Sequence, residues 1–357
     1  MLSYRLKLRT QVAALLSATV FILSCNKDLP VAVPIQPTPP TGSTIMALLD
    51  APSFSLMKAA VTRAGLNTAL NTPTNVYTLF APDDAAFAIS GVNLAMINGM
   101  PLASLQALIS YHLIGGQKYT ASAISDKYPN MYLQSMLMLS APSTSLPPGY
   151  RMPLGISKRG TAAWANQMPI KQADMAASNG VMHVVAALLN PPQLVLAQTI
   201  MGTDPEYAYL RNAIKRADQG PPTGAPALTP LLANAAANFT FFAPTNQAFQ
   251  NLLAGMGLPV DTLTLAALPT TTVWGIVAFH IQSVRAFAPN LDNTSRASIM
   301  GVAQQFNVTS SAVQVRGPGN VVPTPGGPVN YYANVTTSNL NHVNGVIHRV
   351  DAVLLPQ

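Results

Sequence analysis

The sequence predicts an α+β protein built from two tandem copies of one domain, and three observations lead to this prediction. Segment 77–87 has the pattern of a strand that runs into a helix, and the same pattern returns at 239–249. Two further short motifs follow each copy in the same order, at a near-constant spacing. An amphipathic helix precedes each copy as well, at 53–65 and 204–220. Repetition on this scale indicates a duplicated domain.

The repeated segment itself predicts where a strand ends and a helix begins. Residues 77–80 are Tyr-Thr-Leu-Phe, which is typical of a buried strand. Pro82 has no N–H to offer a sheet, so we expect the strand to stop there. Asp83 can then accept a hydrogen bond from the free amides of the next helix, as Thr245 can in the second copy. Phe87 follows about one turn later and is expected to face the core.

Other elements follow from spacing and turn residues. Ser53 is the expected N-cap of the first amphipathic helix and Gly65 its C-cap. In the second copy, Asp204-Pro205 predicts the helix start and Gly220 its end. Further helices are expected around 102–113 and 273–281, strands at 131–139 and 311–316, and loops at 142–153 and 317–328.

The N-terminus has the pattern of a targeting segment. Arg5, Lys7 and Arg9 precede an apolar run at 12–23 that is too short to span a bilayer comfortably. Segment 22–25, Ile-Leu-Ser-Cys, resembles the cleavage box of bacterial lipoproteins, in which the cysteine is lipidated and becomes the mature N-terminus. The alternative is a free thiol beside a signal-anchor helix.

The resemblance at the N-terminus also implies a location. Cys25 is the only cysteine of the chain, so an internal disulfide is impossible. Asn26-Lys27-Asp28 resembles the short polar tags of lipoproteins from Bacteroidetes-type bacteria. We therefore predict an outer-membrane or cell-surface lipoprotein of a Gram-negative bacterium, held to the membrane by a lipid anchor on Cys25.

The predicted organisation has four segments. Residues 1–24 form the signal peptide and 25–43 a linker, because five prolines between positions 30 and 40 favour extended chain. The first domain is expected at 44–197 and the second at 198–357.

Charge argues against nucleic acid as a partner. The whole chain has a formal net charge of +7. Loss of residues 1–24 would leave 16 basic against 12 acidic residues, or +4, without any long basic cluster.

Three motifs of each copy together resemble the fasciclin-like domain family. The first is the strand–helix segment, the second is Tyr111-His112 or Phe279-His280, and the third begins at Asn179 or Asn344, with offsets of 162, 168 and 165 residues. This resemblance covers residues 44–357 and implies domains that are wedge-shaped β-sandwiches flanked by several helices. It implies a structural role for Phe80, Pro82, Phe87, Asn179, Gly180, His183, Phe242, Pro244, Phe249, Asn344, Gly345 and His348.

Groups for catalysis or metal binding are not arranged in a recognisable pattern. His112 and His280 are expected as core residues, His183 and His348 as hydrogen-bonding residues after Asn-Gly turns, and His342 as a surface residue. A metal site would need several ligands at short spacing, and a nucleophile would need an oriented base. We predict no enzyme activity, no cofactor and no metal.

The resemblance implies adhesion to a surface protein or a glycan. In some animal members the Tyr-His motif is implicated in integrin binding, which makes Tyr111, His112, Phe279 and His280 candidate binding positions. The first alternative is a glycan-binding accessory component of a polysaccharide-uptake system, and the second is a periplasmic structural protein. Candidate aromatic platforms for a glycan are Tyr150, Trp164, Tyr331 and Tyr332.

Overall fold

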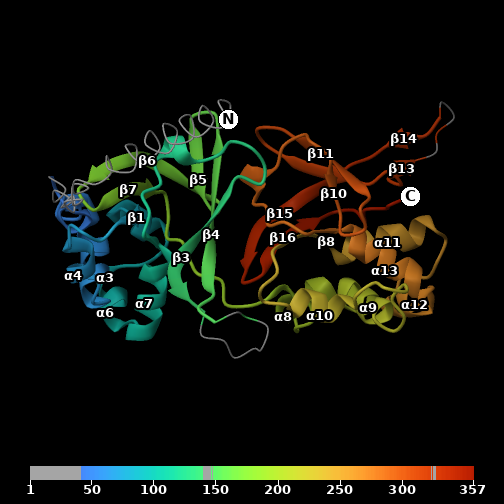
Figure 1. Cartoon of the computed structure of the whole chain (residues 1–357). Helices are drawn as coiled ribbons and strands as arrows, with labels where there is room; N and C mark the ends of the chain where they lie inside the picture. Colours follow the sequence, from blue (N-terminus) through green and yellow to red (C-terminus); the bar gives the residue numbers. More distant parts are fainter. Residues whose placement is uncertain (1–41, 140–145, 147, 323, 325–326) are drawn as a thin grey trace, which may run out of the picture. The chain divides into compact units, whose positions relative to one another are not determined.

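Each repeat of the chain folds into strands with helices gathered along one side, as a computed structural model shows (Figure 1). The structure describes residues 42–139, 146, 148–322, 324 and 327–357. Both repeats lie in one compact unit, residues 40–357. The α+β prediction is confirmed. Among the described residues, every helix is too short or too polar to cross a lipid bilayer.

The first domain places its helices before the main run of strands. Helical segments surround the first strand, and the remaining strands follow as hairpins (Figure 1). The elements are α2 (Ile45–Leu48), η1 (Pro52–Phe54), α3 (Ser55–Arg63), α4 (Asn67–Asn71), β1 (Tyr77–Pro82), α5 (Asp84–Ile89), α6 (Leu94–Gly99), α7 (Leu102–Tyr111), β2 (Leu113–Gly115), η2 (Ala121–Ala123), β3 (Met131–Met138), β4 (Arg151–Arg159), β5 (Ala162–Ala165), β6 (Met168–Ala177) and β7 (Gly180–Val185).

The second domain repeats this order, and several two-residue strands occur among its hairpins. Its elements are α8 (Leu196–Ile200), η3 (Pro205–Tyr207), α9 (Ala208–Ala217), α10 (Leu228–Ala233), β8 (Phe239–Pro244), α11 (Asn246–Gly255), α12 (Thr262–Ala267), α13 (Thr270–Phe279), β9 (Ile281–Gln282), η4 (Ala288–Asn290), β10 (Arg296–Ala297), β11 (Ala303–Val308), β12 (Val313–Arg316), β13 (Val321–Val322), β14 (Val329–Asn330), β15 (Ala333–His342) and β16 (Gly345–Val350).

The first and last strands of each domain lie side by side and parallel. In the first domain seven strands close into a barrel in the order β1 to β7, with Tyr77 opposite Gly180. In the second domain the order is β10-β11-β12-β15-β16-β8-β9, with Phe239 opposite Gly345. This parallel pair brings the repeated strand–helix segment next to the closing motif, although the two are far apart in the sequence.

The central strand lies between two apolar cores. Leu79 and Ala81 of β1 belong to a cluster with the helices, which includes Phe87. Phe80 points to the opposite face and packs in a second cluster inside the barrel. Successive side chains of a strand alternate between faces, so a strand buried on both faces is apolar throughout, as β1 is.

The predicted helix end at Gly65 is confirmed and the predicted start at Ser53 is wrong. Gly65 has φ +79°, and the N–H of Leu66 donates to the carbonyl of Val61, as in a Schellman motif. Ser53 lies inside η1, and α3 begins only at Ser55. Its first turn is bound by a side chain distant in sequence, which local reasoning could not find.

Several other expectations need correction. Asp204 caps η3, as expected of a helix start, but Gly220 lies beyond α9 without a positive φ. Pro153, expected in a loop, is part of β4. His342, expected at the surface, is 6% exposed, and its ring bonds to Thr199.

Candidate functional site

The turn after the first strand is held by the predicted cap. Oδ1 of Asp83 accepts a hydrogen bond from the Ala86 N–H at 2.8 Å. In the second domain Thr245 accepts from the Ala248 N–H at 3.2 Å. Pro82 and Pro244 each end their strand, as predicted. This confirms the reading of the segment as a strand stop followed by a capped helix.

The next residue of the turn has a role that the sequence analysis missed. Asp84 accepts hydrogen bonds from the Leu56 N–H at 2.9 Å and from the Ser55 hydroxyl at 2.7 Å. Asn246 takes the same place in the second domain and binds the Tyr209 N–H there. Asp84 thus fixes the start of α3, and Asn246 fixes the start of α9. The sequence did contain a signal for this role, because a short polar residue stands at this position in both copies.

The asparagine that opens the closing motif joins three parts of its domain. Asn179 is fully buried. Its Oδ1 accepts from the Ile45 N–H at 2.8 Å, and its Nδ2 donates to the carbonyls of Leu70 and Thr72. Asn344 makes the same three kinds of contact in the second domain. Buried backbone groups need hydrogen-bond partners. By supplying them, the asparagine links helical segments that are far from it in the sequence.

The glycine after this asparagine permits close approach of two strands. Gly180 has φ +150°, and a Cβ placed on it would lie 1.9 Å from the carbonyl oxygen of Tyr77. At Gly345 the corresponding distance to the carbonyl oxygen of Phe239 is 2.5 Å. Only glycine fits where the parallel strands begin.

The two histidines of the Tyr-His-type motifs are buried and bonded alike. His112 has its Nδ1 2.8 Å from the carbonyl of Leu108, and its Nε2 accepts the Leu189 N–H at 3.0 Å. His280 is bonded in the same way. The proton is therefore on Nδ1. Burial lowers the pKa of each ring to about 4, so both are neutral at pH 7.

The aromatic residue before each histidine is also inside the protein. Tyr111 and Phe279 are both 0% exposed. The Tyr111 hydroxyl donates to Pro153 and accepts from Asn166 at 3.0 Å, and Asn341 of the second domain lies at 3.5 Å. All four residues of the two motifs are buried, and their role in partner binding stays a prediction.

The histidines of the closing motif stack on the repeated strand. His183 lies over Phe80 at 5.3 Å between ring centroids, and His348 lies over Phe242 at 5.4 Å. Nε2 of His183 donates to the carbonyl of Tyr119. Burial lowers the pKa of both rings, to about 4 for His348. Phe87 and Phe249 are buried in the helical cores of their domains.

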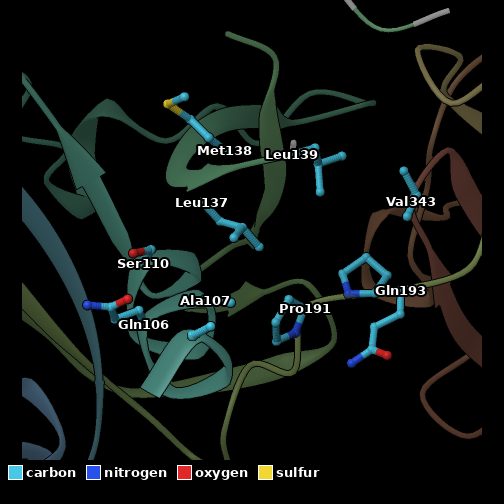
Figure 2. Close-up of a pocket in the computed structure, with 11 residues that line it drawn as sticks. Gln106, Ala107, Ser110, Leu137, Met138, Leu139, Pro191, Gln193 and Val343 are labelled. Atoms are coloured by element: carbon cyan, nitrogen blue, oxygen red, sulfur yellow. The ribbon is translucent and has the colours of Figure 1, made fainter. Parts of the chain in front are cut away.

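A surface cavity lies beside α7, next to the Tyr-His motif (Figure 2). Its volume is about 560 Å³, and α7 contributes Gln106, Ala107 and Ser110. Leu137 points toward Ala107 and Pro191 from the strand side. The lining is mostly apolar, without a titratable side chain. The described part of its lining can accept an apolar contact.

The two domains meet through buried polar contacts. The Tyr132 hydroxyl donates to the backbone carbonyl of Arg285. Nδ2 of Asn290 donates to the Ser157 hydroxyl at 2.6 Å. The ring of Phe287 fits against Gly155, where a Cβ would approach it to 3.0 Å. The two domains are therefore in direct contact through both polar groups and a close-packed aromatic ring.

Arg285 is the largest fully buried side chain among the described residues, and its burial was not predicted from the sequence. Its guanidinium donates to Asn238, Asn341 and the carbonyl of Val343, all neutral oxygens. Burial lowers its pKa. Lys118 occupies the matching position in the first domain. In each domain a threonine hydroxyl binds the carbonyl of the residue before the basic residue, and a histidine ring binds the carbonyl of the residue after it. Lys118 is exposed. The two basic residues therefore differ in burial although they occupy the same position in their domains.

Two further predictions concern a metal site and the lipidation site. Within the described residues, His, Cys, Asp and Glu side chains do not gather in groups of three or more that could hold a metal ion. Cys25, the predicted lipidation site, lies outside the described residues.

Comparison with known proteins identifies the family. The family model "Fasciclin domain" matches residues 52–191 and 224–356. The chain belongs to the fasciclin family. Each matched range falls within one repeat, and fasciclin domains are typical of adhesion and binding proteins.

Individual relatives match parts of the chain. It is 29% identical over 158 residues to the transforming growth factor-beta-induced protein ig-h3 of Sus scrofa, covering 43% of this chain and 20% of that protein. It is 32% identical over 118 residues to protein sll1483 of Synechocystis sp., covering 33% and 55%. The matched part therefore spans a fifth of the pig protein and about half of the cyanobacterial one.

A solved fasciclin pair was also found. It is the FAS1 domain pair from the insect cell adhesion molecule fasciclin I, matched with a TM-score of 0.37 and 14% identity. The match covers 84% of this chain and 95% of that one.

Proposed function

We propose that this protein is an extracytoplasmic adhesion or binding protein, tethered to the membrane through a lipid on Cys25. Its two fasciclin domains support a binding role, because such domains are typical of adhesion proteins. The lipoprotein-like segment 22–25 and the proline-rich linker support the tether. The partner is a surface protein or a glycan.

The strongest support for the proposal is that polar contacts join the two domains. Tyr132 and Ser157 of the first domain are bonded to Arg285 and Asn290 of the second. A partner would then meet one wide surface with a fixed relation between its two halves. Binding through several weak contacts on such a surface gains affinity without a deep pocket.

A glycan-binding accessory component of a polysaccharide-uptake system is the second candidate. A specific observation favours a glycan partner: Trp164 is only partly buried and lines a polar cavity at the domain boundary. A periplasmic structural protein is the third candidate, and location distinguishes it from the other two.

Attachment of cells tests the proposal. A strain of the native host that lacks the protein is complemented with the wild type or with Cys25→Ser, and attachment to extracellular matrix isolated from the same strain is counted. We expect attachment to return with the wild type only, while Cys25→Ser leaves the membrane fraction. Equal attachment of the deletion strain and the complemented strain would contradict the adhesive function.

A further inference from the structure

We propose that a groove at the domain boundary, with Trp164 as its aromatic platform, binds a neutral polysaccharide segment. The groove consists of two cavities of about 340 and 260 Å³ that share Arg159, Pro289 and Val308 in their linings. Trp164 belongs to the larger one. This inference rests on the proposed binding function and names its ligand class and its site.

The two tryptophans of the chain differ in a way that suggests a surface role for one. Trp274 is 8% exposed, and its indole N–H donates to the carbonyl of Pro226 at 3.0 Å. Trp164 is more exposed, and no hydrogen bond between described residues uses its indole N–H. A tryptophan with an accessible ring combines an apolar body with a polar edge.

The sheet holds Trp164 toward the domain boundary. It stands opposite Ser157 in the β4–β5 pair, and cross-strand partners share one face of a sheet. Ser157 is fully buried and bonded to Asn290 of the second domain. The ring is therefore presented on the same face as the interdomain contact, beside Pro289.

The opposite wall is polar and already ordered. Thr309 and Ser311 lie in a turn in which the Thr309 hydroxyl accepts from the Ala312 N–H at 3.1 Å. Oδ1 of Asn339 accepts from the Ala288 N–H at 2.7 Å, which fixes the loop before Pro289. Preformed walls reduce the entropy lost on binding.

Arg159 adds donors at the centre of the groove. Its Nη2 donates to the carbonyls of Pro289, at 2.8 Å, and Leu291 across the domain boundary. All hydrogen bonds that it makes to described residues come from this one nitrogen, so Nε and Nη1 can serve a ligand.

This combination fits a sugar better than a peptide or an anionic polymer. A sugar ring has an apolar C–H face that packs on an aromatic ring and a rim of hydroxyls that need donors and acceptors, and such sites combine few polar groups with an aromatic surface. In the smaller cavity Lys158 and Arg159 are balanced by Asp126 and Asp292. A lining without net charge favours a neutral polymer over an acidic one.

Intrinsic fluorescence can locate the ligand, because the chain has two tryptophans. The full-length protein in detergent is titrated with soluble β-glucan, xylan and mannan, and with alginate as an acidic polymer. We expect at least one neutral polysaccharide to change the emission. The change should be absent in Trp164→Phe and retained in Trp274→Phe. If Trp274→Phe fails to fold, the loss in Trp164→Phe still decides the site.

Affinity electrophoresis with the same polymers gives a second readout. Trp164→Ala should bind about tenfold more weakly, the loss of one stacking contact. Leu263→Ala, an exposed apolar residue of α12 that lines neither cavity of the groove, should bind as the wild type does. A thermal unfolding curve of each variant controls for folding.

The outcomes separate this inference from the proposed function. No response to any neutral polymer, a response to alginate alone, or unchanged binding by Trp164→Ala would overturn the groove as a neutral-glycan site. If Trp164→Ala binds every neutral polymer as the wild type does and its cells still attach to matrix, adhesion stands and the glycan groove does not. Loss of both attachment and polysaccharide binding in Trp164→Ala would support the groove as the adhesive site.

Discussion

Matching residues of the two domains are often the same amino acid and also make the same hydrogen bonds. Asn179 and Asn344 each bind one amide and two carbonyls, and the four motif histidines keep defined tautomers. The sequence analysis predicted the caps at Asp83 and Thr245 because a cap depends on neighbours three residues away. It could not predict the contacts of Asn179, which join segments more than a hundred residues apart.

The buried histidines predict a pH dependence of stability. The pKa values of His112, His280, His342 and His348 are lowered to about 4 by burial, while an unfolded histidine titrates near 6.5. As the pH falls from about 6.5 toward 4, the unfolded chain takes up protons that the folded chain does not. The free energy of unfolding should therefore fall by up to about 1.4 kcal/mol per pH unit for each histidine.

Urea denaturation at several pH values between about 6.5 and 5 measures this slope, in a range where most carboxylates stay ionised. His280→Gln should remove one histidine's share of the slope. Asn307→Ala, on the exposed part of β11, should keep the wild-type slope. Equal slopes in the wild type and His280→Gln would show that this histidine does not titrate as inferred.

At the scale of elements, the parallel pairing of first and last strands organises each domain. The sequence analysis placed the strand–helix segment well, because its proline and cap act locally. The spans of α3 and β4 were less well predicted, since distant contacts set them. Asp84 fixes the start of α3, and Pro153 lies in a strand paired on both sides.

Gly180 tests the importance of this pairing. Gly180→Ala should lower the free energy of unfolding by about 2–4 kcal/mol, because the new methyl group collides with the Tyr77 carbonyl at a positive φ. Gly99→Ala, at the end of α6 with no neighbour within 4 Å, should be neutral or stabilise by about 0.5–1 kcal/mol. Chemical denaturation of both variants gives the comparison. If the two variants were equally stable, the close approach of β1 and β7 would not hold.

On the scale of the whole molecule, the two domains are joined by direct contacts. Sequence motifs established the duplication but carried no sign of the interface, because its residues have no common pattern. Lys118 and Arg285 illustrate this, since one basic residue is exposed and its counterpart is buried. The groove at Trp164 likewise exists only when both domains contribute walls.

A wedge at the interface tests the coupling of the domains. Gly155→Leu would push against Phe287 of the second domain and Tyr132 of the first, at 3.0 and 3.2 Å from the added Cβ. Scanning calorimetry should show one unfolding transition for the wild type and two for this variant. Gly275→Ala, whose Cβ would meet only Met300 at 3.6 Å, should keep a single transition. Two transitions in the wild type would mean that the domains unfold independently.

The central claim is that the domain pair faces the outside of the cell as a binding surface. Protease shaving of intact cells of the native host, followed with an antibody to the second domain and a periplasmic protein as control, tests it most directly. Our account predicts that the antibody signal disappears while the periplasmic control stays intact. Protection of the domains until the outer membrane is opened would contradict the cell-surface function and favour a structural role in the periplasm.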